Sequence, residues 1–90
     1  MITLDDKIIK IDDNSELVRH VIIDSTIFIN RRINYNIAII YYVNTPKEIL
    51  SVNIIEVGPE TSKEDMINLV DNWEKENLEK VLNKLQESTW

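Results

Sequence analysis

Residues 58–73, GPETSKEDMINLVDNW, mark the point at which the chain changes character. Gly58 is the only glycine of the 90 residues, and Pro59 follows it directly. Before this pair the chain is rich in Ile, Val and Tyr, which pack well in β-sheets. After it, Thr61–Glu87 has the spacing of apolar and charged residues typical of an acidic amphipathic helix. The sequence therefore predicts an antiparallel sheet in residues 1–57 and one C-terminal helix in residues 61–87.

The start of this helix carries a capping signal. Thr61 with Glu64 three residues later fits a capping box, in which each side chain binds a free backbone amide at the helix start. Glu64 and Asp65 in the first turn and Lys84 near the end suit the helix dipole. These features predict that the helix begins at Thr61.

The apolar residues of the helix fall into two groups. Met66, Ile67, Val70 and Trp73 lie within about 100° of one another around the axis, the width of a core-facing stripe. The later apolar residues lie roughly 100° further round, so the helix either rolls across the sheet or breaks within residues 74–77. We expect one helix that docks through the first group. The second group consists of Leu78, Val81, Leu82 and Leu85.

Turn-forming residues divide the first part of the chain into strands. Breaks fall at residues 12–15, 24–25, 30–36 and 44–47, where Asn, Asp, Ser and Pro gather. Their short connections favour an antiparallel meander. Two alternatives stay open: Asp24-Ser25 as a bulge within one long strand, which leaves four strands, and residues 15–22 as a short helix. The five expected strands are Lys7–Ile11 (or from Ile2), Leu17–Ile23, Thr26–Ile29, Ile37–Val43 and Ile49–Val57.

Composition indicates a single α+β domain spanning residues 1–90. The chain has no cysteine, which excludes disulfides and thiolate chemistry. It starts with no secretory signal pattern and has no apolar run of about 18 residues, so we expect a soluble, cytoplasmic protein. The net charge of −6 argues against direct nucleic-acid binding, which needs clustered Lys and Arg.

No motif points to catalysis, a metal or a cofactor. His20 is the only histidine, and an ordinary surface or half-buried side chain is the best interpretation of it. Asp12-x-Asn14-x-Glu16 begins like a calcium loop, but the glycine and the bidentate glutamate of that loop are absent. We therefore expect a protein that is not an enzyme and that holds no cofactor.

The predicted sheet has apolar residues on both faces. Strand alternation places Ile37, Ile39 and Tyr41 on one face and Ile40 and Tyr42 on the other. Because one helix covers only one face, the other would expose a large apolar patch on a monomer. We therefore expect a homodimer, or a different protein, or barrel-like closure of the sheet, to cover it. The homodimer is favoured, through Phe28, Ile40 and Tyr42 on the open face rather than through the helix end.

The expected length of the helix suggests an interface at its C-terminal end. A helix of about 25 residues spans roughly 37 Å, against a diameter near 31 Å for a spherical 90-residue domain. The end of the helix would then overhang the sheet and bind a partner through Leu78, Val81, Leu82, Leu85 and Trp90.

These observations favour a small acidic protein-binding module, such as an inhibitor, an immunity protein or an antitoxin. The candidates for imitating phosphates toward a nucleic-acid enzyme are Asp71, Glu74, Glu79 and Glu87. The chain has an excess of Ile and Asn, whose codons are AT-rich. This suggests an AT-rich source genome, in keeping with a phage or plasmid anti-defence factor. The alternative is an accessory subunit of a larger assembly, and the third hypothesis is a small enzyme or ligand-binding domain.

Overall fold

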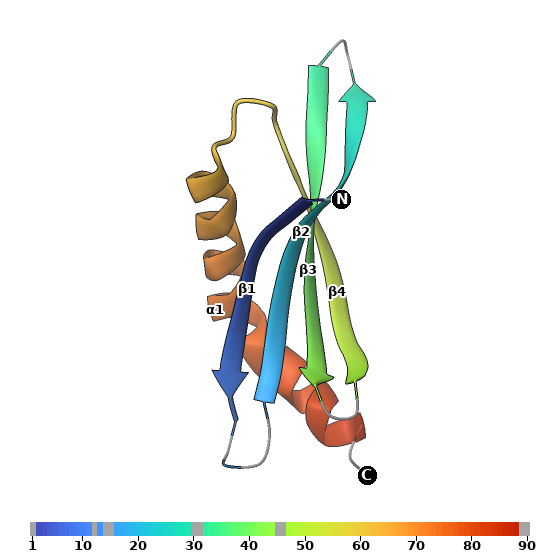
Figure 1. Ribbon diagram of the computed structural model, residues 1–90, viewed down its shortest axis with the longest axis vertical. Helices are drawn as coiled ribbons and strands as arrows, with labels where there is room; N and C mark the ends of the chain where they lie inside the picture. The colour runs from blue at the N-terminus through green and yellow to red at the C-terminus, as the bar shows by residue number, and fades with distance from the viewer. Residues whose placement is uncertain (1, 12, 14–15, 30–31, 45–46, 89–90) are drawn as a thin grey trace.

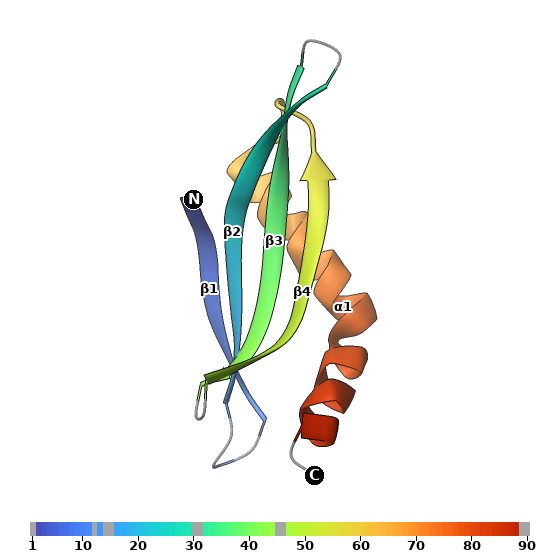
Figure 2. The same ribbon diagram turned by 90° about the vertical axis from the view of Figure 1, so that its right-hand side faces the viewer.

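The computed structural model describes residues 2–11, 13, 16–29, 32–44 and 47–88. Side chains are described throughout these ranges except at residues 25–29, 32, 44, 47 and 85–88. Four strands, β1 (Ile2–Lys10), β2 (Glu16–Ile29), β3 (Arg32–Asn44) and β4 (Lys47–Val57), form one sheet in the order β1-β2-β3-β4. Every neighbouring pair is antiparallel. Helix α1 (Lys63–Ser88) crosses one face of the sheet diagonally (Figures 1 and 2), so the predicted α+β meander with a C-terminal helix is confirmed.

The second strand settles both open alternatives. β2 runs through the Asp24-Ser25 break, and the register with β3 shifts between Ile23 and Ser25. The break is therefore a bulge in one long strand, and the sheet has four strands rather than five. Residues 16–22 are extended, not helical. Leu17 and Val18 lie on opposite faces of this central strand, and both are buried.

The far ends of β2 and β3 extend beyond the other strands. The pairing of β3 with β4 ends at Tyr35 and Val57, whereas the pairing with β2 continues to Ile29 and Arg32. This hairpin projects from one end of the molecule (Figure 1). The overall dimensions are 48 × 21 × 19 Å, so the domain is elongated rather than spherical.

Helix α1 starts with a different cap from the one that the sequence pattern predicts. The Ser62 hydroxyl accepts a hydrogen bond from the Asp65 backbone amide at 3.1 Å, which makes Ser62 the N-cap. The Thr61 amide instead donates to the Gly58 carbonyl at 3.2 Å and closes the turn that leaves β4. The predicted Thr61–Glu64 capping box is therefore wrong by one residue. From Lys63 the helix continues without a break to Ser88.

The apolar core lies between α1 and the sheet. Met66 and Val70 are buried there, with Ile67 and Trp73 half-buried, as predicted for the first helical group. Val81 is also buried, at 2% exposure, so the expected overhang of the helix end is wrong at this residue. The cause is the long sheet, which is not the sphere from which that expectation was calculated. The buried core residues are Leu4, Leu17, Val21, Ile37, Ile39, Tyr41, Val57, Met66, Val70 and Val81.

Candidate protein-binding surface

The face of the sheet opposite α1 is apolar across all four strands. Residues paired between neighbouring strands share a face, and three such rows run across the sheet here. We call this surface the open face. The rows are Ile8–Val18–Tyr42–Ile49, Asp6–His20–Ile40–Val52 and Thr3–Ile22–Ala38–Ile54.

The most exposed apolar side chains of the open face lie on its two outer strands. On β1, Ile8 is 62% exposed, and on β4 the values are 62% for Ile49, 53% for Val52 and 54% for Ile54. The central strands are covered by these neighbours, so that Val18, Ile22 and Ala38 are buried. No described element packs over this face (Figure 2). It therefore forms an apolar surface with a filled centre, interrupted in its middle row by Asp6 and His20.

Polar side chains border the open face. Lys10 and Glu16 are neighbours across β1 and β2 at one end, and Asn34 Nδ2 donates to Glu56 Oε1 at 3.0 Å at the other. Beside Ile40 in the middle row, His20 Nδ1 contacts Asp6 Oδ1. An apolar centre with a polar rim is the usual anatomy of a protein interface.

The opposite face, under α1, contains a polar row within the core. Strand pairing aligns Lys7, Arg19, Tyr41 and Ser51 across all four strands. Apolar residues lie on both sides of this row, Leu17 toward one end and Val21 toward the other. Helix α1 crosses directly above it.

Arg19 is the centre of an ion-pair network in this row. Its Nη1 donates to Asp71 Oδ1 at 2.7 Å and to Glu74 Oε1 at 3.4 Å, and its Nη2 donates to Asp5 Oδ2 at 2.8 Å. Only 2% of the Arg19 side chain is exposed, and its Nε has no hydrogen-bond partner among the described residues. Such a charge is tolerated because carboxylates from both the sheet and the helix surround it.

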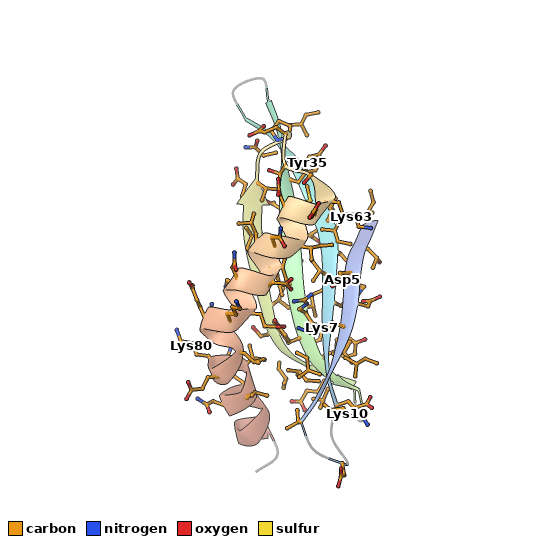
Figure 3. All side chains as sticks on the ribbon, turned by 90° about the vertical axis from the view of Figure 1, so that its left-hand side faces the viewer. Asp5, Lys7, Lys10, Tyr35, Lys63 and Lys80 are labelled. Carbon is orange, nitrogen blue, oxygen red and sulfur yellow. The ribbon has the colours of Figure 1, made fainter. Side chains whose placement is uncertain are left out.

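Glu74 links the network to two further side chains. Its Oε2 accepts from Lys7 Nζ at 2.8 Å, and its Oε1 accepts from the Tyr41 hydroxyl at 2.8 Å. The Tyr41 ring also stacks on Trp73 of α1, with centroids 6.0 Å apart. Figure 3 shows Asp5 and Lys7 of β1 beside the middle of the helix. The network therefore fixes the position of α1 along and across the sheet.

Burial and charge shift the proton affinity of two groups in the network. Burial by itself would lower the pKa of Arg19, but its hydrogen bonds to Asp71 and Asp5 and the charge of Glu74 raise it above its ordinary value. The guanidinium therefore stays charged in the core. Burial raises the pKa of the Tyr41 phenol, and its hydrogen bond to Glu74 and the charge of that carboxylate raise it further. Tyr41 accordingly acts as a neutral donor.

The interface residues predicted from the sequence lie on the open face, on α1 and among the side chains that are not described. Ile40 and Tyr42 lie half-buried on the open face, as expected. On the helix, Glu79 is exposed, whereas Leu82 is half-buried and packs against the core. The side chains of Phe28, Leu85 and Glu87 lie outside the described residues, as do Trp90 and, in the calcium-like stretch, Asp12 and Asn14.

Two of the acids proposed as phosphate mimics face inward. Glu74 is 8% exposed, so the expectation that it is displayed to a partner is wrong. Asp71 is half-exposed but bound to Arg19. Sequence reasoning missed Arg19 and its role. The available signal was a charged residue at an inward position of an apolar strand, between Leu17 and Val21.

The described residues contain no cluster of three or more His, Asp or Glu side chains arranged to hold a metal ion. Within the same part of the chain, α1 is too polar to span a bilayer, and no other helix is present. Comparison with protein families, curated proteins and solved structures finds no match to this chain.

Proposed function

We propose that this protein is a non-enzymatic protein-binding module and that the open face is its interaction surface. The observation that carries the proposal is the set of four large apolar side chains on the outer strands, each more than half exposed. On a monomer, a contiguous apolar patch of this kind marks an interaction site more often than a solvated surface. Burial of these side chains would supply the binding energy. They are Ile8, Ile49, Val52 and Ile54.

The area of this surface is at the low end for stable interfaces. Outer strands of 9 and 11 residues at about 3.3 Å per residue, in a sheet of four strands about 4.8 Å apart, give a face of roughly 600 Å², and a standard interface takes about 800 Å² from each partner. The apolar rows fill the middle of that face. A partner with a flat apolar surface would therefore pack against the sheet without rearrangement of the strands.

The net charge of the chain favours a basic partner. Asp6, Glu16, Glu56 and Lys10 have described side chains on the open face, and the strand register assigns Arg32 and Lys47 to positions of the same face. Charges of both signs therefore border the apolar rows. The chain as a whole carries −6. Complementary charge at the rim speeds association and excludes wrong partners. Proteins that act on nucleic acids present such basic surfaces, which supports an inhibitor, immunity protein or antitoxin, including an anti-defence factor of a mobile element.

The net charge also bears on the proposed homodimer. Two copies stacked through the open face would bring together two chains that each carry −6. Salt screens this repulsion, so dimerisation through this face should strengthen as the salt concentration rises. A basic partner would show the opposite dependence. In the absence of such a partner, we propose that the protein pairs with a second copy of itself.

A photo-crosslinking amino acid at position 52 tests the proposal in the source cell. Leu69 of α1 is 42% exposed and lies on the other side of the molecule from the open face, so position 69 is the matched control. We expect adducts at position 52 and none at position 69. An adduct of twice the 10.6 kDa chain mass identifies the second copy, and any other mass identifies a different protein.

The outcome also separates the inhibitor from the accessory subunit. An inhibitor should lower the activity of the captured protein when it is added to the purified partner. An accessory subunit should instead co-purify at fixed stoichiometry without that effect. Equal labelling at positions 52 and 69, or none at position 52, would contradict the assignment of the open face.

A further inference from the structure

We propose that the depression between β4 and the C-terminal half of α1 binds a small planar anion of the aromatic carboxylate class. This inference concerns the side of the sheet opposite the open face, and it does not depend on the proposed protein-binding function. It rests on the shape, charge and polar groups of the depression.

The depression has a volume of about 260 Å³ and is partly open to solvent. Ser51 and Asn53 line it from β4, and residues of α1 from Trp73 to Lys84 line it from the helix. Pockets for drug-sized ligands occupy about 300–1,000 Å³. This site therefore suits a ligand with a single ring.

The charged residues that line the depression are both lysines, Lys80 and Lys84. They are four residues apart in the helix and so project from the same side of it. Neither makes an ion pair with a carboxylate of the described side chains, whereas Lys7 is bound to Glu74. Figure 3 shows Lys80 on the side of α1 away from Lys7 and Asp5. In a chain of net charge −6, two lysines that pair with no carboxylate among the described side chains, beside one depression, favour an anionic ligand.

Fixed polar groups lie beside these lysines. Ser51 is only 9% exposed, and its hydroxyl accepts a hydrogen bond from Asn53 Nδ2 at 3.0 Å. That arrangement leaves the Ser51 hydroxyl proton to donate to a ligand oxygen. On the helix side, Asn77 Nδ2 donates to the Trp73 carbonyl at 2.8 Å, which holds the Asn77 side chain in place.

An aromatic and an aliphatic side chain complete the lining. The Trp73 indole stacks against Tyr41 at an interplanar angle of 28°, so its orientation is fixed. Val81 is buried beside it. A flat ring packs on these groups through its faces, while its carboxylate reaches the two ammonium groups. The combination selects an aromatic carboxylate over a bare anion or an uncharged ring.

Titration with benzoate, followed by the ¹H–¹⁵N signal of the Trp73 indole, tests the inference. The chain has two tryptophans, and a Trp90→Phe background leaves Trp73 as the single indole. For so small a ligand we expect saturable shifts with a Kd of about 1 mM. Benzyl alcohol and inorganic phosphate, which lack the charge and the ring respectively, should each bind at least about tenfold more weakly, since one of the two contacts is lost.

The double variant Lys80→Gln/Lys84→Gln should weaken benzoate binding about tenfold or more. Lys75→Gln is the matched control, because Lys75 is exposed on the same helix but does not line the depression. It should leave the Kd unchanged. All three positions are exposed, so these variants should retain the helical content of the parent.

Several outcomes would overturn the inference. One is an absence of saturation at about 20 mM benzoate, twenty times the expected Kd. Another is a Kd for benzyl alcohol or phosphate equal to that for benzoate. The third is a Lys75→Gln variant that weakens benzoate binding as much as the double variant does. Loss of binding confined to the double variant supports it.

Discussion

The two faces of this sheet distribute polarity in opposite ways. The face under α1 buries an arginine, a tyrosine hydroxyl and a glutamate, each with partners from the other layer. The open face exposes isoleucine and valine with no described element over them. A stable monomer usually places charge outside and large apolar groups inside. The helix-covered face is therefore packed within the fold, whereas the open face is the surface that we propose for contact with another protein.

The covered face also shows what a buried ion-pair network contributes. Well-packed apolar residues often stabilise a protein as much as buried charges do. The carboxylates that surround Arg19 come from β1 and from two positions on α1. We infer that the network selects one placement of the helix among the many that a uniformly apolar interface would allow. The following experiments compare the two faces, from the largest expected effect to the smallest.

Replacing Arg19 with methionine should cost about 3–5 kcal/mol of unfolding free energy, because it leaves the Glu74 carboxylate buried without its arginine partner. Urea denaturation measures this loss. Lys10→Met removes a cation from an exposed position of the open face and should change stability by less than about 0.5 kcal/mol. A further change of Glu74 to leucine in the Arg19→Met protein should recover part of the loss. A cost below about 1 kcal/mol for Arg19→Met would show that the network is not a major part of the core.

Truncation of Trp73 to alanine should cost about 3 kcal/mol, at the lower end of the range for buried tryptophans, since the indole is half-buried and stacked on Tyr41. Leu69→Ala on the exposed side of the same helix is the control and should cost less than about 1 kcal/mol. Thermal unfolding of both variants gives the comparison. Equal costs for the two would place Trp73 outside the core.

The raised pKa of Tyr41 predicts a loss of stability at alkaline pH. The folded state holds the phenolic proton more tightly than the unfolded chain does. The stabilisation is therefore complete below the ordinary tyrosine pKa of about 10. Above it, stability should fall by up to about 1.4 kcal/mol per pH unit until the folded-state pKa is reached.

Urea denaturation at several pH values between 9 and about 11.5 tests this, with Tyr41→Phe as the control. The phenylalanine variant is less stable at neutral pH, because Glu74 loses a donor, but its stability should decline less steeply above pH 10. Parallel declines in the two proteins would assign the alkaline loss to other groups.

Alanine at Ile54 of the open face should change stability by less than about 0.5–1 kcal/mol, since more than half of this side chain is already exposed. Alanine at Ile39, fully buried under α1, should cost about 2–5 kcal/mol. Sedimentation equilibrium of Ile54→Ala should also show weaker self-association than the parent. A large stability loss at Ile54 in a monomeric sample would mean that the open face is part of the fold and not a binding surface.

Local patterns in the sequence were sufficient to predict the elements and their order. Strand alternation placed Tyr41 and Tyr42 on opposite faces, and helical spacing placed Met66 and Val70 toward the sheet. These predictions succeed because the periods of strands and helices depend on backbone geometry alone. The N-cap was misplaced by one residue, since neighbouring hydroxyl residues at Thr61 and Ser62 compete for the same role.

The sequence by itself determined a four- or five-stranded meander, a C-terminal helix and the presence of apolar residues on both sheet faces. Tertiary structure alone decided that Glu74 points inward, that Arg19 gathers carboxylates from residues up to 55 positions away, and that Lys80 and Lys84 border a depression. The reason is physical. Periodicity fixes which side of its own element a residue occupies, whereas an ion pair between layers depends on the crossing position of helix and sheet. That position is set by the packing of the whole core.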